Sequence, residues 1–236
     1  MSTATESPLE KYLTPIAVLL GALIIALAFA FGGGDRPAGD DTGTASNVDI
    51  KDVQTDGAPF IGSVTAPVTV AVWYDFQCGY CKRFEASTLA DVEKEFVDSG
   101  KVKIVYKDFQ FLGQASLDTA VYSRAVWDAA PTLWSTWFKQ VMAGEGEATL
   151  TTAGLDAVST AVGIDAARIS TLIKEKGAEY KAAIEADRAE GQSFGITGTP
   201  GSIIGTTLVG GAQPYLATGR SNEQPVKPLI EAELAK

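Results

Sequence analysis

A buried strand that leads directly into a pair of cysteines constrains the fold of this chain more than any other feature. Residues 67–74 form a continuous β-rich apolar run, which is typical of a strand covered on both faces. Cys78 and Cys81 follow within a short turn. Apolar residues then recur at helical spacing, namely Phe84, Leu89, Val92, Phe96 and Val97. The two thiols are therefore predicted to lie where a buried strand turns into an amphipathic helix.

The chain has only these two cysteines and no histidine. Without histidine there is no Ser-His-Asp or Cys-His nucleophile pair and no zinc site built on imidazole. A zinc site built on thiols needs a second cysteine pair, and a disulfide across so short a loop constrains the unfolded chain little. We interpret the pair as redox chemistry that needs no metal and no other cofactor. An inert structural disulfide is the alternative.

The position of the cysteines predicts different roles for them. The thiolate is the reactive form of cysteine, and the start of a helix favours an anion, so Cys78 should be the exchanging sulfur. Lys82 and Arg83 add positive charge one turn later, whereas Cys81 should be the more shielded thiol. In oxidation, a substrate thiolate attacks the Cys78 sulfur of the disulfide, and a second substrate thiol resolves the mixed disulfide. In reduction these steps run backwards.

The N-terminal region is apolar enough to enter a membrane. Residues 12–34 carry no charge, and a stretch of this length spans about 30 Å of hydrocarbon as a helix. We interpret 12–34 as a transmembrane anchor or uncleaved signal, preceded by an N-terminal tail over 1–11. Residues 28–30 also have the small-x-small form of a cleavage site, so a secreted or periplasmic protein is the alternative.

The residues after the apolar segment divide into a linker and a folded domain. Residues 35–56 are rich in Gly, Asp, Thr and Ser and predict a flexible tether, which leaves 57–236 as the domain. A reactive disulfide belongs in an oxidising compartment, so we expect this domain outside the cytoplasm, held at the cell membrane by a single span. The formal charge of −10 argues against a nucleic-acid partner.

The rest of the domain alternates strand and helix signals. Residues 101–107 alternate apolar and charged side chains and predict a second strand. Residues 114–194 have helical periodicity and fit four or five helices, with breaks expected near Pro131, residues 144–146, Gly163 and Gly177. A hairpin over 203–209 and a helix over 228–235 follow. This order predicts an α/β domain with a helical insertion. In the insertion, Trp127, Trp134 and Trp137 either line a peptide groove or, as we favour, anchor the core.

Several stretches together carry a family resemblance. They are Gly62 to Val70, Asp75-Phe-Gln-Cys-Gly-Tyr-Cys-Lys82, Lys107-Asp-Phe109, Gly195-Ile-Thr-Gly-Thr-Pro200 and Val209-Gly-Gly-Ala-Gln-Pro-Tyr215. Over roughly residues 57–236 the chain resembles the bacterial DsbA-like thioredoxin family. The resemblance implies a thioredoxin fold with an inserted helical subdomain over about 114–194.

The resemblance also implies roles for further residues. Thr199 and Pro200 would form a cis peptide packed against the cysteines, with the Thr199 backbone free to pair with an extended substrate. Relatives often carry a buried acid where this chain has Val72, and Asp75 is a possible substitute. Strongly oxidising relatives often carry a histidine between the cysteines, where this chain has Gly79 and Tyr80. These two residues, with Asp75 and Lys82, are the expected redox-tuning positions.

These observations predict a membrane-tethered, extracytoplasmic thiol–disulfide oxidoreductase that oxidises cysteines of exported or cell-surface proteins. A quinone-linked membrane partner would restore the disulfide between Cys78 and Cys81. Two alternatives stay open: a disulfide reductase or isomerase that uses the same site, and a non-catalytic peptide-binding module with a structural disulfide.

Overall fold

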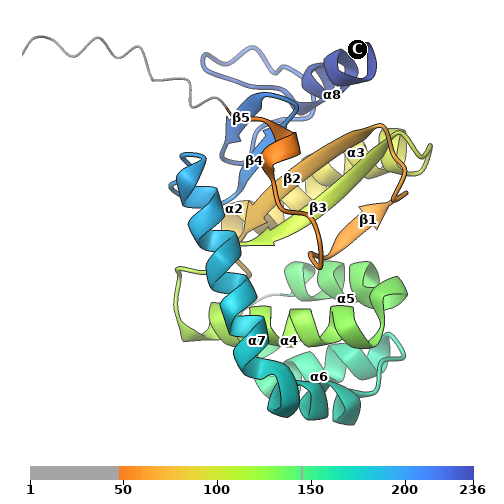
Figure 1. Cartoon of the computed structure of the whole chain (residues 1–236), viewed down its shortest axis with the longest axis vertical. Helices are drawn as coiled ribbons and strands as arrows, with labels where there is room; N and C mark the ends of the chain where they lie inside the picture. The colour runs from red at the N-terminus through yellow and green to blue at the C-terminus, as the bar shows by residue number, and fades with distance from the viewer. Residues whose placement is uncertain (1–47, 145) are drawn as a thin grey trace, which may run out of the picture. The chain divides into compact units, whose positions relative to one another are not determined.

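The computed structural model describes residues 48–144 and 146–236 (Figure 1). The N-terminal tail, the predicted anchor over 12–34 and the first part of the predicted linker lie outside the described residues. Within the two described ranges, no helix is both long enough and apolar enough to cross a membrane.

Within the described residues, five strands form one sheet in the order β1-β3-β2-β4-β5. Their bounds are Phe60–Gly62 for β1, Val68–Tyr74 for β2, Val102–Asp108 for β3, Gly201–Ile204 for β4 and Thr207–Gly210 for β5. Strand β2 is central, parallel to β3 and antiparallel to β4. It is buried along nearly its whole length, as its continuous apolar sequence predicted. The short edge strand β1 was not predicted.

The predicted strand–turn–helix unit is confirmed. Helix α2, Gly79–Phe84, begins directly after Cys78 and runs on without a break through α3, Ala90–Val92. Two π-helical turns, η2 (Glu85–Leu89) and η3 (Glu93–Val97), flank α3. Such turns widen a helix locally and recur near functional sites.

The predicted helical insertion is confirmed, with one correction. In the described residues it contains α4 (Gln114–Ala129), α5 (Pro131–Ala143), the 3-10 turn η4 (Glu147–Leu150), α6 (Thr152–Ala161) and α7 (Ala166–Ser193). Figure 1 shows α7 returning past α4 toward the sheet, where it packs against β3. The break expected near Gly177 is wrong, because α7 runs through it. A single glycine costs a helix only about 1 kcal/mol, which packing against α4 can offset.

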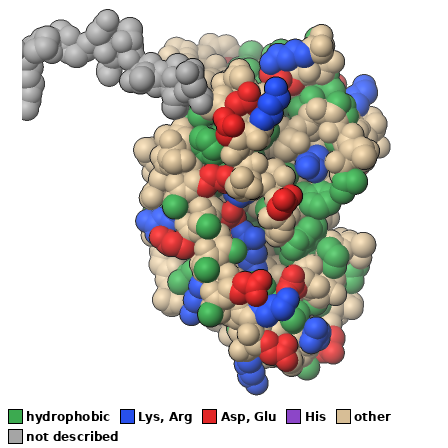
Figure 2. All heavy atoms as spheres, in the orientation of Figure 1, with side chains coloured by type: hydrophobic (Ala, Val, Ile, Leu, Met, Phe, Trp, Pro, Cys, Tyr) green, Lys and Arg blue, Asp and Glu red, His purple; other side chains and the backbone are tan. Residues whose placement is uncertain are grey.

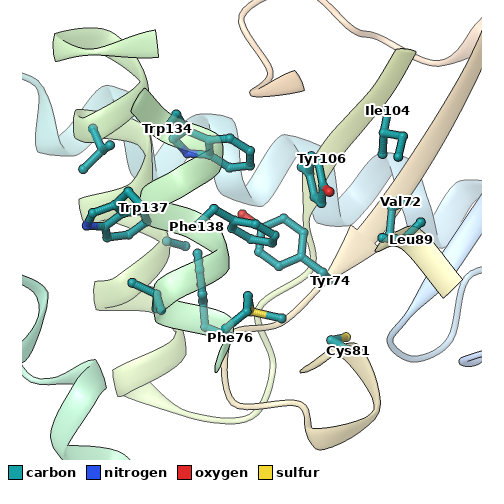
Figure 3. Close-up of a cluster of buried hydrophobic side chains, with 14 of the residues drawn as sticks. Val72, Tyr74, Phe76, Cys81, Leu89, Ile104, Tyr106, Trp134, Trp137 and Phe138 are labelled. Atoms are coloured by element: carbon teal, nitrogen blue, oxygen red, sulfur yellow. The ribbon is translucent and has the colours of Figure 1, made fainter. Parts of the chain in front are cut away.

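The tryptophans of the insertion pack into its core, as we predicted in preference to a peptide groove. Trp134 and Trp137 are fully buried, and each indole donates a 3.0 Å hydrogen bond to a buried serine hydroxyl. Trp134 stacks on Phe138 with ring centroids 4.7 Å apart, and Trp127 packs edge-on against Trp134. Figure 3 shows Phe138 and Trp134 beside Tyr74 and Tyr106 of the sheet, and the Phe138 ring contacts Tyr74 while the Trp134 ring contacts Tyr106. The aromatic cluster therefore joins the insertion to the sheet.

The hairpin and the final helix also form where they were predicted. Strands β4 and β5 are joined through Gly205, whose φ of +57° is the left-handed conformation that glycine accepts most easily. The last helix, α8, spans Val226–Leu234 and buries Val226 and Ile230.

The folded domain begins earlier than predicted. Val48 and Val53 are buried in a second core cluster, and Ile50–Asp52 forms the 3-10 turn η1 between them. The Ile50 N–H donates a 2.8 Å hydrogen bond to the Gly205 carbonyl. The predicted linker over 35–56 is therefore wrong for residues 48–56, because its two valines pack into the domain.

Strand β3 is more deeply buried than its alternating sequence suggests. Lys107 is only 2% exposed and forms ion pairs of 2.5 Å with Asp187 and 2.9 Å with Glu190. Next to it, Arg124 of α4 pairs with Asp108 at 2.7 Å and also with Asp187. We call these five residues the ion cluster. The ion cluster joins β3 to α4 and α7. The alternating sequence of β3 predicts that its charged side chains face solvent, but α7 covers Lys107.

Candidate redox site

Cys78 lies at the turn between β2 and α2, where it caps the helix. Its backbone is extended, with φ −75° and ψ 110°, and its sulfur accepts the Cys81 backbone N–H at 3.4 Å. The first turn of a helix leaves N–H groups without intrahelical partners, and their partial positive charge favours an anion. The predicted placement of Cys78 at a helix start is confirmed.

The two thiols differ in their hydrogen bonds more than in their exposure. Cys78 is 7% exposed and Cys81 is 3% exposed, and both are free thiols. Hydrogen bonds, the largest from the Cys81 thiol, lower the pKa of Cys78 to about 5 even though burial opposes them. Burial and the same hydrogen bond raise the pKa of Cys81 far above its ordinary range. The pair therefore holds one thiolate and one protonated thiol at neutral pH.

The loop before β4 comes back to the cysteines. The Thr199–Pro200 peptide is cis, as the resemblance implied, and the Thr199 carbonyl lies 3.3 Å from the Cys78 sulfur. Residues 195–201 and 208–211 line an open groove of about 260 Å³ beside this loop. A groove beside the loop that contacts Cys78 is a place where an extended polypeptide can lie.

Asp75 fixes the turn that carries the cysteines. It is fully buried, and its carboxylate accepts hydrogen bonds from Ser116 Oγ at 2.5 Å and from three backbone N–H groups at 2.8–3.1 Å, those of Gln77, Phe111 and Leu112. These donors occupy the lone pairs of both oxygens. Asp75 therefore joins the turn that carries the cysteines to the loop before α4. Its carboxylate contacts these donors rather than a thiol.

The other expected tuning positions surround Cys78 unevenly. Tyr80 is 62% exposed, and the Arg83 guanidinium lies 4.7 Å from its ring centre. A side chain at Gly79 would meet no atom within 4 Å. Lys82 donates a 2.6 Å hydrogen bond to the Gly144 carbonyl, so its ammonium group lies against the end of α5. Lys82 was expected to stabilise the Cys78 thiolate, but the hydrogen bond of its ammonium group goes to Gly144 and not to the Cys78 sulfur.

One acidic residue near the site was not predicted. Glu85 is only 8% exposed and lies one helical turn after Cys81, and the Tyr106 hydroxyl donates to it at 3.2 Å. Burial first and the charge of Glu93 second raise the pKa of Glu85 to about 7, although Lys139 and Tyr106 oppose the change. The spacing of four residues from Cys81 was visible in the sequence, but the burial was not.

The family follows from this geometry together with sequence comparison. Residues 54–220 match the family model described as Thioredoxin. The chain belongs to the thioredoxin family. The chain is 36% identical over 75 residues to disulfide bond formation protein D of Bacillus subtilis. That match spans 32% of this chain and 34% of the relative.

Two solved structures are similar to this chain over more of its length. The thiol-disulfide exchange protein alpha-DsbA2 from Wolbachia pipientis has a TM-score of 0.61 and 25% identity, covering 66% of this chain and 80% of its own. BdbD from Bacillus subtilis, solved in the oxidised state, has a TM-score of 0.65 and 22% identity. It covers 78% of this chain and 96% of its own, which shows a shared fold. The predicted thioredoxin fold with a helical insertion is confirmed.

Proposed function

We propose that this chain is an extracytoplasmic thiol–disulfide oxidoreductase that oxidises cysteines of exported proteins through Cys78 and Cys81. The observation that carries the proposal is the opposite displacement of the two thiol pKa values, downward for Cys78 and upward for Cys81. A stabilised thiolate favours the reduced form of the pair, which makes the disulfide form a stronger oxidant. The name of the Bacillus subtilis relative, disulfide bond formation protein D, supports this direction.

The reaction moves two electrons from substrate to protein. A substrate thiolate attacks the Cys78 sulfur of the Cys78–Cys81 disulfide, and the electron pair of the broken S–S bond goes to Cys81. A second substrate thiolate then attacks the substrate sulfur of the mixed disulfide and releases Cys78 as a thiolate. The substrate leaves with a disulfide, and the protein is left as a dithiol. A low Cys78 pKa assists the second step, because a more stable thiolate is a better leaving group.

The substrate would approach along the Thr199–Pro200 loop. Its backbone would pair with the Thr199 backbone as an added strand, beside the groove lined by residues 195–201 and 208–211. The exposed ring of Tyr80, two residues after Cys78, supplies a further surface for the substrate. Contacts made mainly with the substrate backbone suit a protein that acts on many sequences.

Placement and recycling complete the proposal. Residues 12–34 would anchor the chain in the cell membrane, and the thioredoxin domain would lie outside the cytoplasm. A membrane redox partner linked to quinones would accept the two electrons from the dithiol. The mixture of acidic and basic side chains on the face in Figure 2 agrees with a protein that does not bind nucleic acid.

The two cysteine variants test the activity. A reduced substrate protein with two cysteines is mixed with the oxidised full-length chain, and recovery of substrate activity is followed. Cys78→Ser should abolish turnover. The single-cysteine chain Cys81→Ser is mixed instead with a substrate that already carries a disulfide. It should hold a mixed disulfide through Cys78, because the Cys78 thiolate breaks the substrate disulfide and no Cys81 thiol is present to release it. Full activity in both variants would contradict the proposal.

The direction of electron flow needs a measurement in cells. Alkylation of free thiols after acid quenching reports whether Cys78 and Cys81 are bonded in the growing cell. An oxidase should be found mainly as the disulfide. A mainly reduced pair would indicate the reductase alternative, which the absence of histidine between the cysteines also fits.

A further inference from the structure

Cys81 has no acid beside it on the central strand, but it has one on its own helix. Val72 of β2 is buried where relatives were expected to carry an acid. Cys81, Val72, Glu85 and Tyr106 line one small cavity of about 10 Å³, close to the volume that a single water molecule needs. Figure 3 labels Cys81, Val72 and Leu89 in the same cluster of buried side chains. Glu85 and Cys81 therefore line the same small cavity, through which a proton can pass between them.

Glu85 also borders a groove on the protein surface. Together with Ala86, Ala90 and Met142, it lines a groove of about 240 Å³ that is open to solvent between the active-site helix and α5. The inner cavity and the outer groove share this residue and Met142. Methionine does not titrate. Among the described residues that line these two cavities, Glu85 is therefore the titratable group that borders both.

The charged and polar surroundings set the proton affinity of Glu85. Across the groove, Lys139 of α5 forms an ion pair with Glu93. The titratable groups that face Glu85 or share a cavity with it are Cys81 and Lys82 on α2, Glu93 on η3, Tyr74 on β2, Tyr106 on β3 and Lys139 on α5. Burial and Glu93 together bring the pKa of Glu85 to about 7, so both of its forms are populated near neutral pH. This is the condition for an efficient general acid and base.

We propose that Glu85 carries the proton to and from Cys81 during disulfide exchange, in place of the acid that Val72 replaces. The proposal rests on the proposed function, because it concerns the same exchange reaction. When the Cys78–Cys81 bond breaks, the electron pair stays on the Cys81 sulfur, and protonated Glu85 supplies the proton. When the bond re-forms, the Glu85 carboxylate takes the proton from the Cys81 thiol as that sulfur attacks. Solvent restores Glu85 through the outer groove.

The test isolates the step in which Cys81 attacks. Reduced full-length chain is mixed with excess oxidised glutathione, quenched with acid at intervals and analysed by mass spectrometry. A first phase, which depends on glutathione concentration, forms the mixed disulfide at Cys78. A second phase, independent of that concentration, releases glutathione as Cys81 attacks. The rate of the second phase is measured against pH.

In the unmodified chain, the second phase should accelerate with pH and level off above a pKa near 7, where Glu85 is ionised. Glu85→Gln keeps an oxygen for Tyr106 but cannot take a proton. Its second phase should be slower by about 10²-fold at neutral pH, the usual size of general-base catalysis. It should also continue to accelerate at higher pH, because the Cys81 thiol must then ionise by itself.

Glu93→Gln is the matched control. It removes the neighbouring charge that raises the pKa of Glu85, so the plateau should remain while its onset moves to lower pH. This shift tests the proposal even if Glu85→Gln does not fold.

Two results would overturn the inference. One is a second phase in Glu85→Gln that is as fast as in the unmodified chain, or faster, as loss of a negative charge near Cys81 alone would predict. The other is an onset that does not move in Glu93→Gln. Absence of any first phase in the unmodified chain would instead overturn the proposed function.

Discussion

Gly191 lies so close to Trp73 that no side chain fits between the last helix of the insertion and the central strand. A Cβ at Gly191 would be 2.7 Å from the indole nitrogen of Trp73. One turn earlier on α7, the Asp187 carbonyl accepts a 2.8 Å hydrogen bond from the same nitrogen. The insertion is thus attached to β2 by close backbone approach, beside the strand that leads to Cys78.

This contact predicts the effect of a single methyl group. Gly191→Ala should lower the free energy of unfolding by about 1–3 kcal/mol, because α7 must shift away from the indole. Gly177→Ala is the control, since its Cβ meets nothing closer than 3.9 Å and alanine favours a helix interior by about 1 kcal/mol. Urea unfolding of both variants gives the comparison. A stabilised Gly191→Ala would show that α7 does not pack as described.

The hydrogen bond from the Cys81 thiol predicts how the Cys78 thiolate responds to mutation. The pKa of Cys78 should be near 5, and Cys81→Ala should raise it because the largest stabilising donor is lost. Cys81→Ser keeps a hydroxyl donor and should raise it less. Thiolate absorbance in the ultraviolet and alkylation rates against pH measure all three chains. Equal values for Cys81→Ala and the unmodified chain would mean that backbone N–H groups alone stabilise the thiolate.

The exposed position of Tyr80 allows a cation to be added beside Cys78. Tyr80→His should make the disulfide more oxidising, by about 30 mV for each unit by which the Cys78 pKa falls. The effect should grow as the pH falls below about 6.5, where histidine gains its charge. Tyr80→Gln, a neutral change at the same site, separates charge from loss of the ring. Equilibration with glutathione at several pH values gives the potentials, and a pH-independent difference would contradict the charge mechanism.

The ion cluster should be far more sensitive to mutation than exposed ion pairs. Arg124→Met leaves Asp108 and Asp187 with less neutralising charge in a buried site, which should cost about 3–5 kcal/mol of stability. Lys176→Met breaks only the exposed pair with Asp128 and should cost less than about 1 kcal/mol. Chemical denaturation compares the two variants. Similar losses would mean that water enters the cluster.

The sequence predicted the redox turn well because its signals are local. The continuous apolar strand, the two cysteines and the helical repeat all lie within residues 67–97. Neighbouring residues are therefore enough to predict the strand, the turn and the helix. The cis peptide at Pro200 came from family resemblance, since local spacing does not specify a contact with Cys78, 121 residues away.

The features that were missed depend on long-range packing. Lys107 belongs to an alternating pattern that indicates a half-exposed strand, and it is buried only because α7 brings Asp187 and Glu190 against it. Glu85 has the ordinary appearance of a solvent-facing helical acid until the insertion covers it. The sequence predicts a linker at Val48 and Val53, because two valines in a polar stretch show neither a helical nor a strand periodicity.

The position of the insertion between β3 and β4 has a consequence for biogenesis. The Thr199 carbonyl can reach the Cys78 sulfur only after the chain has been extended through the whole insertion. Contacts this distant in sequence form late in folding, because the long loop between them must close first. We therefore expect both cysteines to emerge from the ribosome or translocon well before their site is complete. A nascent chain therefore carries both thiols before the Thr199 contact with Cys78 can form.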